Sequence, residues 1–223
     1  MRWLGCLGGR GLTKTDAEYI EHRDKMAKAS RERSAAESGA TCSASGVSAK
    51  GIKMCKQDII EFCAQHCACE EFCGWALDTC DSMYDVWLSA SPKWLVWVAT
   101  RHGVLSDKEL RLFACYCVRQ VWHLLDDDRS KNAVIVAEKY ANGEATDKEL
   151  SLAHSYAACA AVIVYAHKGV GAMWSAALAA KAVATLQATN AARAAASYVA
   201  EAASDVVISQ AAYLRERFSP FVQ

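Results

Sequence analysis

Apolar residues recur every three or four positions over most of the chain from residue 54 onward, which is the spacing of one face of an α-helix. One such stripe consists of Leu110, Phe113, Ala114, Cys117, Val121 and Leu124. No stretch alternates apolar and polar residues over a length that a β-strand requires. The pattern therefore predicts an all-α protein.

Two helix starts are marked by the same short motif. Ser106 is followed three residues later by Glu109, and Thr146 is followed by Glu149 forty positions further along the chain. In such a capping box the hydroxyl accepts from the backbone N–H of the third helical residue, and the Glu accepts from the N–H of the cap. We expect a helix to begin at each motif, and Asn142-Gly143 to end the helix between them.

Further helices follow from the same periodicity. We expect them over Gln57 to about His66, Glu70 to Cys80, Met83 to Ser89, Pro92 to His102-Gly103, and from the Asp126–Asp128 run onward. After Thr146 the pattern stays helical to Phe218, which suggests two or three helices with breaks near Gly169–Gly171 and near Asn190. The predicted architecture is a compact multi-helix bundle of stacked antiparallel helix pairs over residues 54–223.

The first 53 residues differ from the rest. Their apolar positions are sparse, and Ser38–Ser48 is rich in Ser, Gly and Ala, as linkers are. We expect residues 1–53 to form a basic N-terminal tail, partly helical or disordered, that is extended or poorly packed against the bundle.

Charge and hydropathy indicate where the protein is located and which classes of partner it binds. The 223 residues include 25 Lys and Arg and 25 Asp and Glu, so no overall basic field points to nucleic acid. We find no window of ~18 uncharged apolar residues, because Ala157–Ala166 is too short and Gly169–Thr189 contains Lys181. The N-terminal apolar run Trp3–Leu7 is too short for the core of a secretory signal. We expect a cytoplasmic protein with reduced thiols, no membrane association and no nucleic-acid partner.

Cysteines gather in one part of the chain. Of 11 cysteines in total, several accompany a histidine in the set Cys63, His66, Cys67, Cys69 and Cys73. Helical spacing would direct some of these side chains to one face, and zinc needs four ligands in a tetrahedron. Paired C-x-x-C motifs are missing, so burial as small core residues is the preferred interpretation and a metal site the minor one.

Tryptophan and arginine residues supply the candidate partner contacts. Both residue types are favoured at interface hot spots, although tryptophans at helical spacing usually form core. The candidate contacts are Trp87, Trp94, Arg101, Arg119, Asp127 and Arg129. No nucleophile elbow, metalloprotease motif or phosphate-binding loop is present, so we predict no enzymatic activity and no cofactor.

The middle of the chain resembles a known group of proteins. The segments Trp94–Ala99 and Leu110–Arg119, together with Asp128-Arg129-Ser130 and the alanine-rich tail, are similar to an alanine-rich family of bacteria and phages. Its members are described as immunity proteins, by similarity to those of polymorphic toxin systems. The resemblance covers about residues 54–217 and implies an all-helical binding protein without a cofactor.

Three functions therefore stay open. The first is a non-enzymatic binding protein of immunity or counter-defence type, which neutralises a toxin or defence effector by covering its site. The second is a protein that sequesters a small charged metabolite or nucleotide signal between helices. The third is a structural module stabilised by zinc through the cysteines near residues 55–80.

Overall fold

The computed structural model describes residues 49–221, with side chains from residue 56 onward. This part of the chain is built of α-helices and one short 3-10 helix and has no strand, which confirms the all-α class. The elements are α2 (Ala49–Gln65), α3 (Glu70–Thr79), α4 (Met83–Ser89), α5 (Pro92–Ala99), α6 (Asp107–Gln120), η1 (Trp122–Leu124), α7 (Asp128–Ala141), α8 (Asp147–Lys168), α9 (Ala172–Val183), α10 (Ala188–Ala202) and α11 (Val206–Arg217). The expected tail lies outside the described residues, apart from residues 49–53, which belong to α2.

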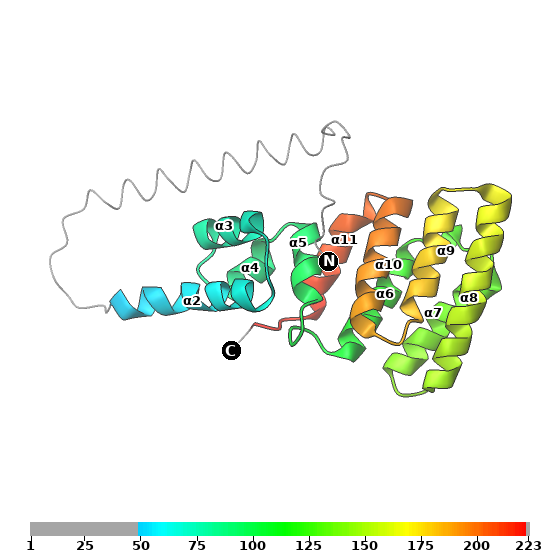
Figure 1. The fold of residues 1–223 in the computed structure, drawn as a ribbon, viewed down its shortest axis with the longest axis horizontal. Helices are drawn as coiled ribbons and strands as arrows, with labels where there is room; N and C mark the ends of the chain where they lie inside the picture. Colours follow the sequence, from blue (N-terminus) through cyan, green and yellow to red (C-terminus); the bar gives the residue numbers. More distant parts are fainter. Residues whose placement is uncertain (1–48, 222–223) are drawn as a thin grey trace.

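The helices stack along one long axis (Figure 1). Helices α2–α4 form one end and α8 forms the other, with α9 packed between α8 and α10, and α10 packed against α6. Helix α7 contacts α6, α8 and α9, whereas α11 returns to pack against α5 and α6. Short connections join neighbouring helices of this stack, so the predicted antiparallel pairs are confirmed.

Both predicted capping boxes are formed. The hydroxyl of Ser106 accepts from the backbone N–H of Glu109 at 3.3 Å, and the Glu109 carboxylate accepts from the backbone N–H of Ser106 at 2.8 Å. Thr146 and Glu149 repeat this arrangement with the same two distances. Helix α7 ends at Ala141 with Asn142 as its C-cap, and Gly143 follows with a positive φ of 78°, as expected of a left-handed cap.

The C-terminal half divides into more helices than the sequence predicts. Four helices, not two or three, follow Thr146. The break at Gly169–Gly171 is confirmed, and the second break occupies residues 184–187, just before the predicted position at Asn190. The third break, at residues 203–205, was not predicted because Ala203-Ser204-Asp205 contains neither Gly nor Pro.

The core changes character along the stack. Helices α9 and α10 meet through buried alanines, among them Ala176, Ala179, Ala180, Ala191, Ala192 and Ala195. Because an alanine side chain is a single methyl group, two such helices can approach closely. At the other end the core is aromatic and includes Phe62, Phe72, Trp75, Trp94 and Trp97.

Helix α8 has a longer apolar stretch than the sequence analysis considered. Among the described residues it is the one helix long and apolar enough to cross a membrane, as judged by length and composition alone. The sequence prediction missed it because it considered the short run Ala157–Ala166 and not the whole helix from Asp147 to Lys168. Only 28% of its most apolar window is buried within the protein. Helix α8 thus exposes several large apolar residues, among them Leu152, Tyr156 and Val162.

Candidate functional site

Trp87 was predicted as a partner contact, and the structure corrects this. Its side chain is 1% exposed, and its indole N–H donates to the carbonyl oxygen of Phe218 at 3.1 Å. Arg215 on α11 in turn donates to the carbonyl oxygen of Trp87 at 3.2 Å. Trp87 therefore attaches the C-terminal segment to α4 and has no surface to offer a partner.

Trp94 and Arg101 belong to the aromatic end of the stack. The half-buried Trp94 ring packs at 4.9 Å from Trp75 and 5.6 Å from Phe72, measured between ring centroids. The guanidinium of Arg101 lies 4.7 Å from the centroid of the Trp97 ring and donates to the Trp97 carbonyl oxygen at 3.0 Å. Burial lowers the pKa of Arg101 below its usual value. Both residues chiefly hold local structure together.

Arg119 lies on the surface at the end of α6. Its guanidinium donates to both carboxylate oxygens of Glu138 on α7, at 2.9 and 2.7 Å. It also lies 4.2 Å from the centroid of the Trp122 ring. The hydrogen bond to Glu138 raises the pKa of Arg119. A guanidinium that is held by Glu138 on one side and by the Trp122 ring on the other loses little further conformational freedom when a partner binds.

Asp127 and Arg129 form a second bidentate pair at the start of α7. Asp127 caps the helix by accepting from the backbone N–H of Arg129 at 2.9 Å, and the Arg129 side chain donates to the same carboxylate at 3.0 and 2.6 Å. The hydrogen bond from the Arg129 side chain lowers the pKa of Asp127. We call Arg119, Trp122, Glu138, Asp127 and Arg129 together the α6–α7 corner. Glu138 follows Arg129 by nine residues, so the two pairs lie on opposite sides of α7.

The cysteine and histidine set does not assemble as ligands. Within residues 56–221 no three His, Cys, Asp or Glu side chains are positioned to hold a metal ion. Cys63 interacts with Cys73, and burial followed by this interaction raises the pKa of the Cys63 thiol to about 12. The His66 ring instead packs at 4.5 Å from that of Phe62, and Cys67 and Cys69 are exposed. The set Cys63, His66, Cys67, Cys69 and Cys73 is thus not a preformed zinc site.

The two thiols of α6 lack the environment of a nucleophile. Burial raises the pKa of Cys115 to about 12 and that of Cys117 well above its usual value. Cys115 donates to the carbonyl oxygen of Val134 at 3.9 Å, which is a weak hydrogen bond and not an acid–base pair. A thiol that stays protonated is a poor nucleophile. These cysteines therefore act as small core residues.

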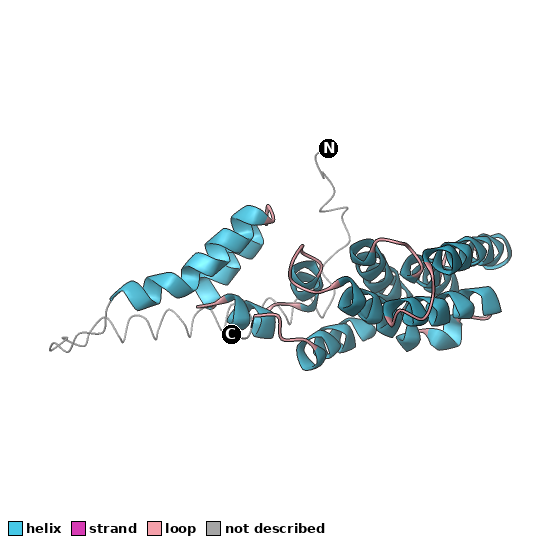
Figure 2. Cartoon of the chain, turned by 90° about the horizontal axis from the view of Figure 1, so that it is seen from below, coloured by secondary structure: helices cyan, strands magenta, loops and turns pink. Residues whose placement is uncertain are grey.

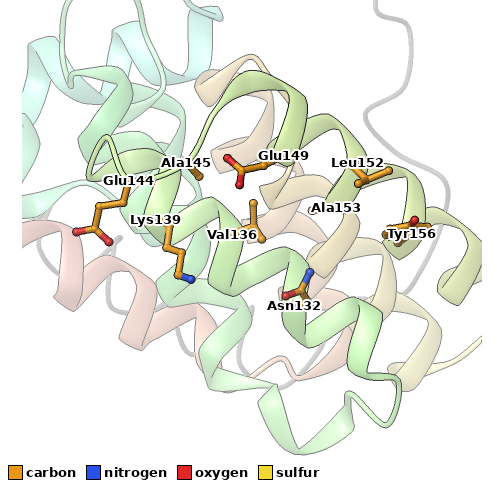
Figure 3. A pocket seen from close by; sticks show the side chains of 9 residues that line it. All are labelled: Asn132, Val136, Lys139, Glu144, Ala145, Glu149, Leu152, Ala153 and Tyr156. Atoms are coloured by element: carbon orange, nitrogen blue, oxygen red, sulfur yellow. The ribbon is translucent and has the colours of Figure 1, made fainter.

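A shallow groove between α7 and α8 was not predicted (Figure 3). It encloses about 230 Å³ and is lined by Asn132, Val136, Lys139, Glu144, Ala145, Glu149, Leu152, Ala153 and Tyr156. Pockets for small ligands usually measure about 300–1,000 Å³ and bury most of the ligand. The one signal in the sequence is the uncharged run that contains Leu152 and Tyr156, but its register against α7 is a tertiary property.

Comparisons with known proteins give no relative for this arrangement. No family model matches the chain, and neither the curated proteins nor the solved structures contain a match.

Proposed function

We propose that this chain is a non-enzymatic helical binding protein, of immunity or counter-defence type, that neutralises a toxin or defence effector. It works in the cytoplasm of a bacterium or of a phage-infected cell and covers a site on its partner. The observation that carries the proposal is the α6–α7 corner, where the Arg119 guanidinium is stacked on Trp122 and held by Glu138.

The corner has the composition of an interface hot spot. Arginine and tryptophan contribute more to binding energy than other residue types when they are fixed and become desolvated. The Arg129–Asp127 pair adds a second guanidinium, and the side chains of Arg119 and Arg129 are each 40% exposed. Both guanidiniums can donate hydrogen bonds to a carboxylate of the partner. The nearby Asp126 and Asp128 carboxylates can attract basic groups of the partner during association.

Sequestration of a small charged molecule is the second candidate. It would use the α7–α8 groove, whose rim carries Lys139, Glu144 and Glu149. The groove is open and small, and its charges are of both signs, so a protein partner is favoured. A thermal-shift screen of nucleotides distinguishes the two: stabilisation by one nucleotide, lost in Lys139→Glu, supports sequestration.

The zinc-stabilised module ranks third, because Cys63, His66, Cys67, Cys69 and Cys73 include no three side chains positioned to hold a metal ion in the described part of the chain. Metal analysis of protein purified without chelators tests it, and stoichiometric zinc would support it.

The experiment for the main proposal is affinity capture from the native host with matched variants. Bait protein is the wild type, Arg119→Glu, Arg129→Glu, and Arg193→Glu as control, since Arg193 is exposed on α10 away from the α6–α7 connection. We expect one protein to be retained by the wild type and by Arg193→Glu and to be lost from the two corner variants. Co-expression of the wild type should relieve growth inhibition by that protein. Equal retention by all four baits would refute the proposed surface.

A further inference from the structure

One face of α8 is apolar and open to solvent. Leu152 and Tyr156 are each 50% exposed and Val162 is 67% exposed. The face, which we call the α8 outer face, consists of Leu152, Ser155, Tyr156, Cys159, Val162, Ile163 and Ala166. It contains positions 152, 156, 159, 163 and 166, the alternating four- and three-residue spacing of a helix–helix seam. No Asp, Glu, Lys or Arg occurs from Ser151 to Ala166.

The fold leaves most of this face without a neighbour, although Leu152 and Tyr156 also line the α7–α8 groove. Helix α8 forms one end of the stack and packs against α7 and α9 (Figures 1 and 2). It turns its other side inward, where Leu150, Ala153, Ala157, Ala160 and Ala161 are buried. Contiguous exposed apolar surface of this kind usually marks an interaction site.

We infer that the α8 outer face binds a second copy of this chain, through antiparallel α8 helices related by a two-fold axis at Cys159. Such an interface must be self-complementary, because the same residues contribute from both copies. In this register Leu152 lies opposite the partner's Ala166, Ser155 opposite the partner's Ile163, and Tyr156 opposite the partner's Val162. Each pair joins a larger side chain to a smaller one, so the two faces can interdigitate.

The ends of α8 carry matching charges. Asp147 and Glu149 lie in its first turn, and His167 and Lys168 lie in its last turn. Antiparallel pairing brings the acidic first turn of each copy to the basic last turn of the other. Lys168 lies on the opposite side of α8 from Cys159, where it bonds Asp126 at 2.9 Å, so His167 is the last-turn basic residue nearer the outer face. The helix dipoles oppose each other in the same arrangement.

The same features count against a lipid surface as the occupant. A helix that lies on a membrane usually presents Lys and Arg along its polar border. The borders of the α8 outer face carry Ser151 and Tyr165 along its length, and Lys148 is the one Lys or Arg on this side of the helix, between Asp147 and Glu149. The inference rests on the α8 outer face and not on the proposed neutralising function, although Arg129 of the α6–α7 corner lies near Cys159.

Sedimentation equilibrium of the full chain under reducing conditions, at up to about 100 µM, tests the pairing. We expect the wild type to form dimers and Val162→Glu to raise the dissociation constant at least about tenfold. The control is Ile208→Glu on α11, because Ile208 is 74% exposed and lies outside α8. It should leave the dimer intact. Circular dichroism should show both variants folded.

Chemical cross-linking gives the register. A short bismaleimide should link Cys159 to Cys159 of a second copy, as identified by peptide mass spectrometry, and Cys159→Ser should abolish that product.

Three outcomes would overturn the inference. These are a wild type that stays monomeric throughout, a Val162→Glu variant that dimerises like Ile208→Glu, and cross-links that join other cysteines while Cys159 remains unlinked. Flotation of a monomeric wild type with phosphatidylcholine vesicles would assign the face to a membrane instead.

Discussion

The buried guanidinium of Arg111 on α6 donates a 2.9 Å hydrogen bond to the carbonyl oxygen of Val183, 72 residues later. The same group donates to the carbonyl oxygens of Thr185 and Leu186, each at 2.7 Å, and lies 4.9 Å from the centroid of the Tyr140 ring. Carbonyls at the end of a helix have no partner within that helix. Arg111 supplies their partners and so fixes the connection of α9 to α10.

Replacement of Arg111 should therefore destabilise the fold. Arg111→Met leaves three carbonyls of the α9–α10 connection without donors, and we expect a loss of about 2–4 kcal/mol in the free energy of unfolding. Urea denaturation followed by circular dichroism measures it. Arg119→Gln is the matched control, since Arg119 is an exposed partner of an ion pair and should cost less than about 1 kcal/mol. Equal costs at the two sites would contradict the structural role.

The capping boxes should each contribute measurably. Ser106→Ala and Thr146→Ala remove the acceptor for the backbone N–H of Glu109 and Glu149. We expect each to lower the free energy of unfolding by about 1 kcal/mol. Ser197→Ala, at an exposed position within α10, should be neutral or slightly stabilising because alanine favours a helix interior. A Ser106→Ala variant as stable as Ser197→Ala would show that the first box contributes nothing.

Acid should weaken the start of α7. The folded pKa of Asp127 is held below its usual 3.8 by the hydrogen bond from the Arg129 side chain. A depressed folded pKa means that the contribution is complete above about pH 3.8 and is lost as the pH falls through the folded value. Asp127→Asn keeps the capping ability but removes the titration. We expect a shallower fall of stability with acid in this variant; an unchanged pH profile would contradict the assignment.

Trp87 should affect stability and not partner binding. Trp87→Phe removes the donor to the Phe218 carbonyl, and we expect a cost of roughly 1–3 kcal/mol in thermal or urea unfolding. Trp174→Phe is the control, because Trp174 is half-buried against Tyr165, with ring centroids 5.6 Å apart. It should cost less. We expect Trp87→Phe and the wild type to bind the captured partner with equal affinity. A loss of binding without a loss of stability would show that Trp87 contacts the partner.

Thiol labelling should separate two classes of cysteine. Cys67, Cys69 and Cys159 are exposed and should react with a maleimide in the native state, as followed by site-resolved mass spectrometry. Cys115 and Cys117 are buried with raised pKa values and should react only on unfolding. Rapid native labelling of Cys115 would show that α6 opens easily.

Local signals in the sequence predict the fold well. The hydroxyl and carboxylate at Ser106 and Glu109 act within one turn, and Gly143 and Gly169 supply the positive φ that ends a helix. The end of α9 has no such signal, because the carbonyls of Val183 and of Thr185 and Leu186 in the following connection accept from Arg111 on a distant helix. Sequence periodicity cannot anticipate a partner 72 residues away.

The surface was harder to predict than the helices. Trp87 and Arg119 are both of a residue type that is common at hot spots. Trp87 is nevertheless buried and donates to the Phe218 carbonyl, whereas Arg119 is exposed. Helix α8 has no Asp, Glu, Lys or Arg on any side from Ser151 to Ala166, so its sequence does not show which side is buried, and the end of the stack leaves one side open. Which face is covered depends on packing between helices, and that is absent from any local pattern.

The central claim is that the α6–α7 corner binds a protein partner, and titration calorimetry with the captured partner tests it most directly. We predict that Arg119→Glu combined with Arg129→Glu weakens binding by at least about tenfold with little change in melting temperature, while Arg193→Glu binds as the wild type does. Undiminished affinity in the double variant would contradict the account.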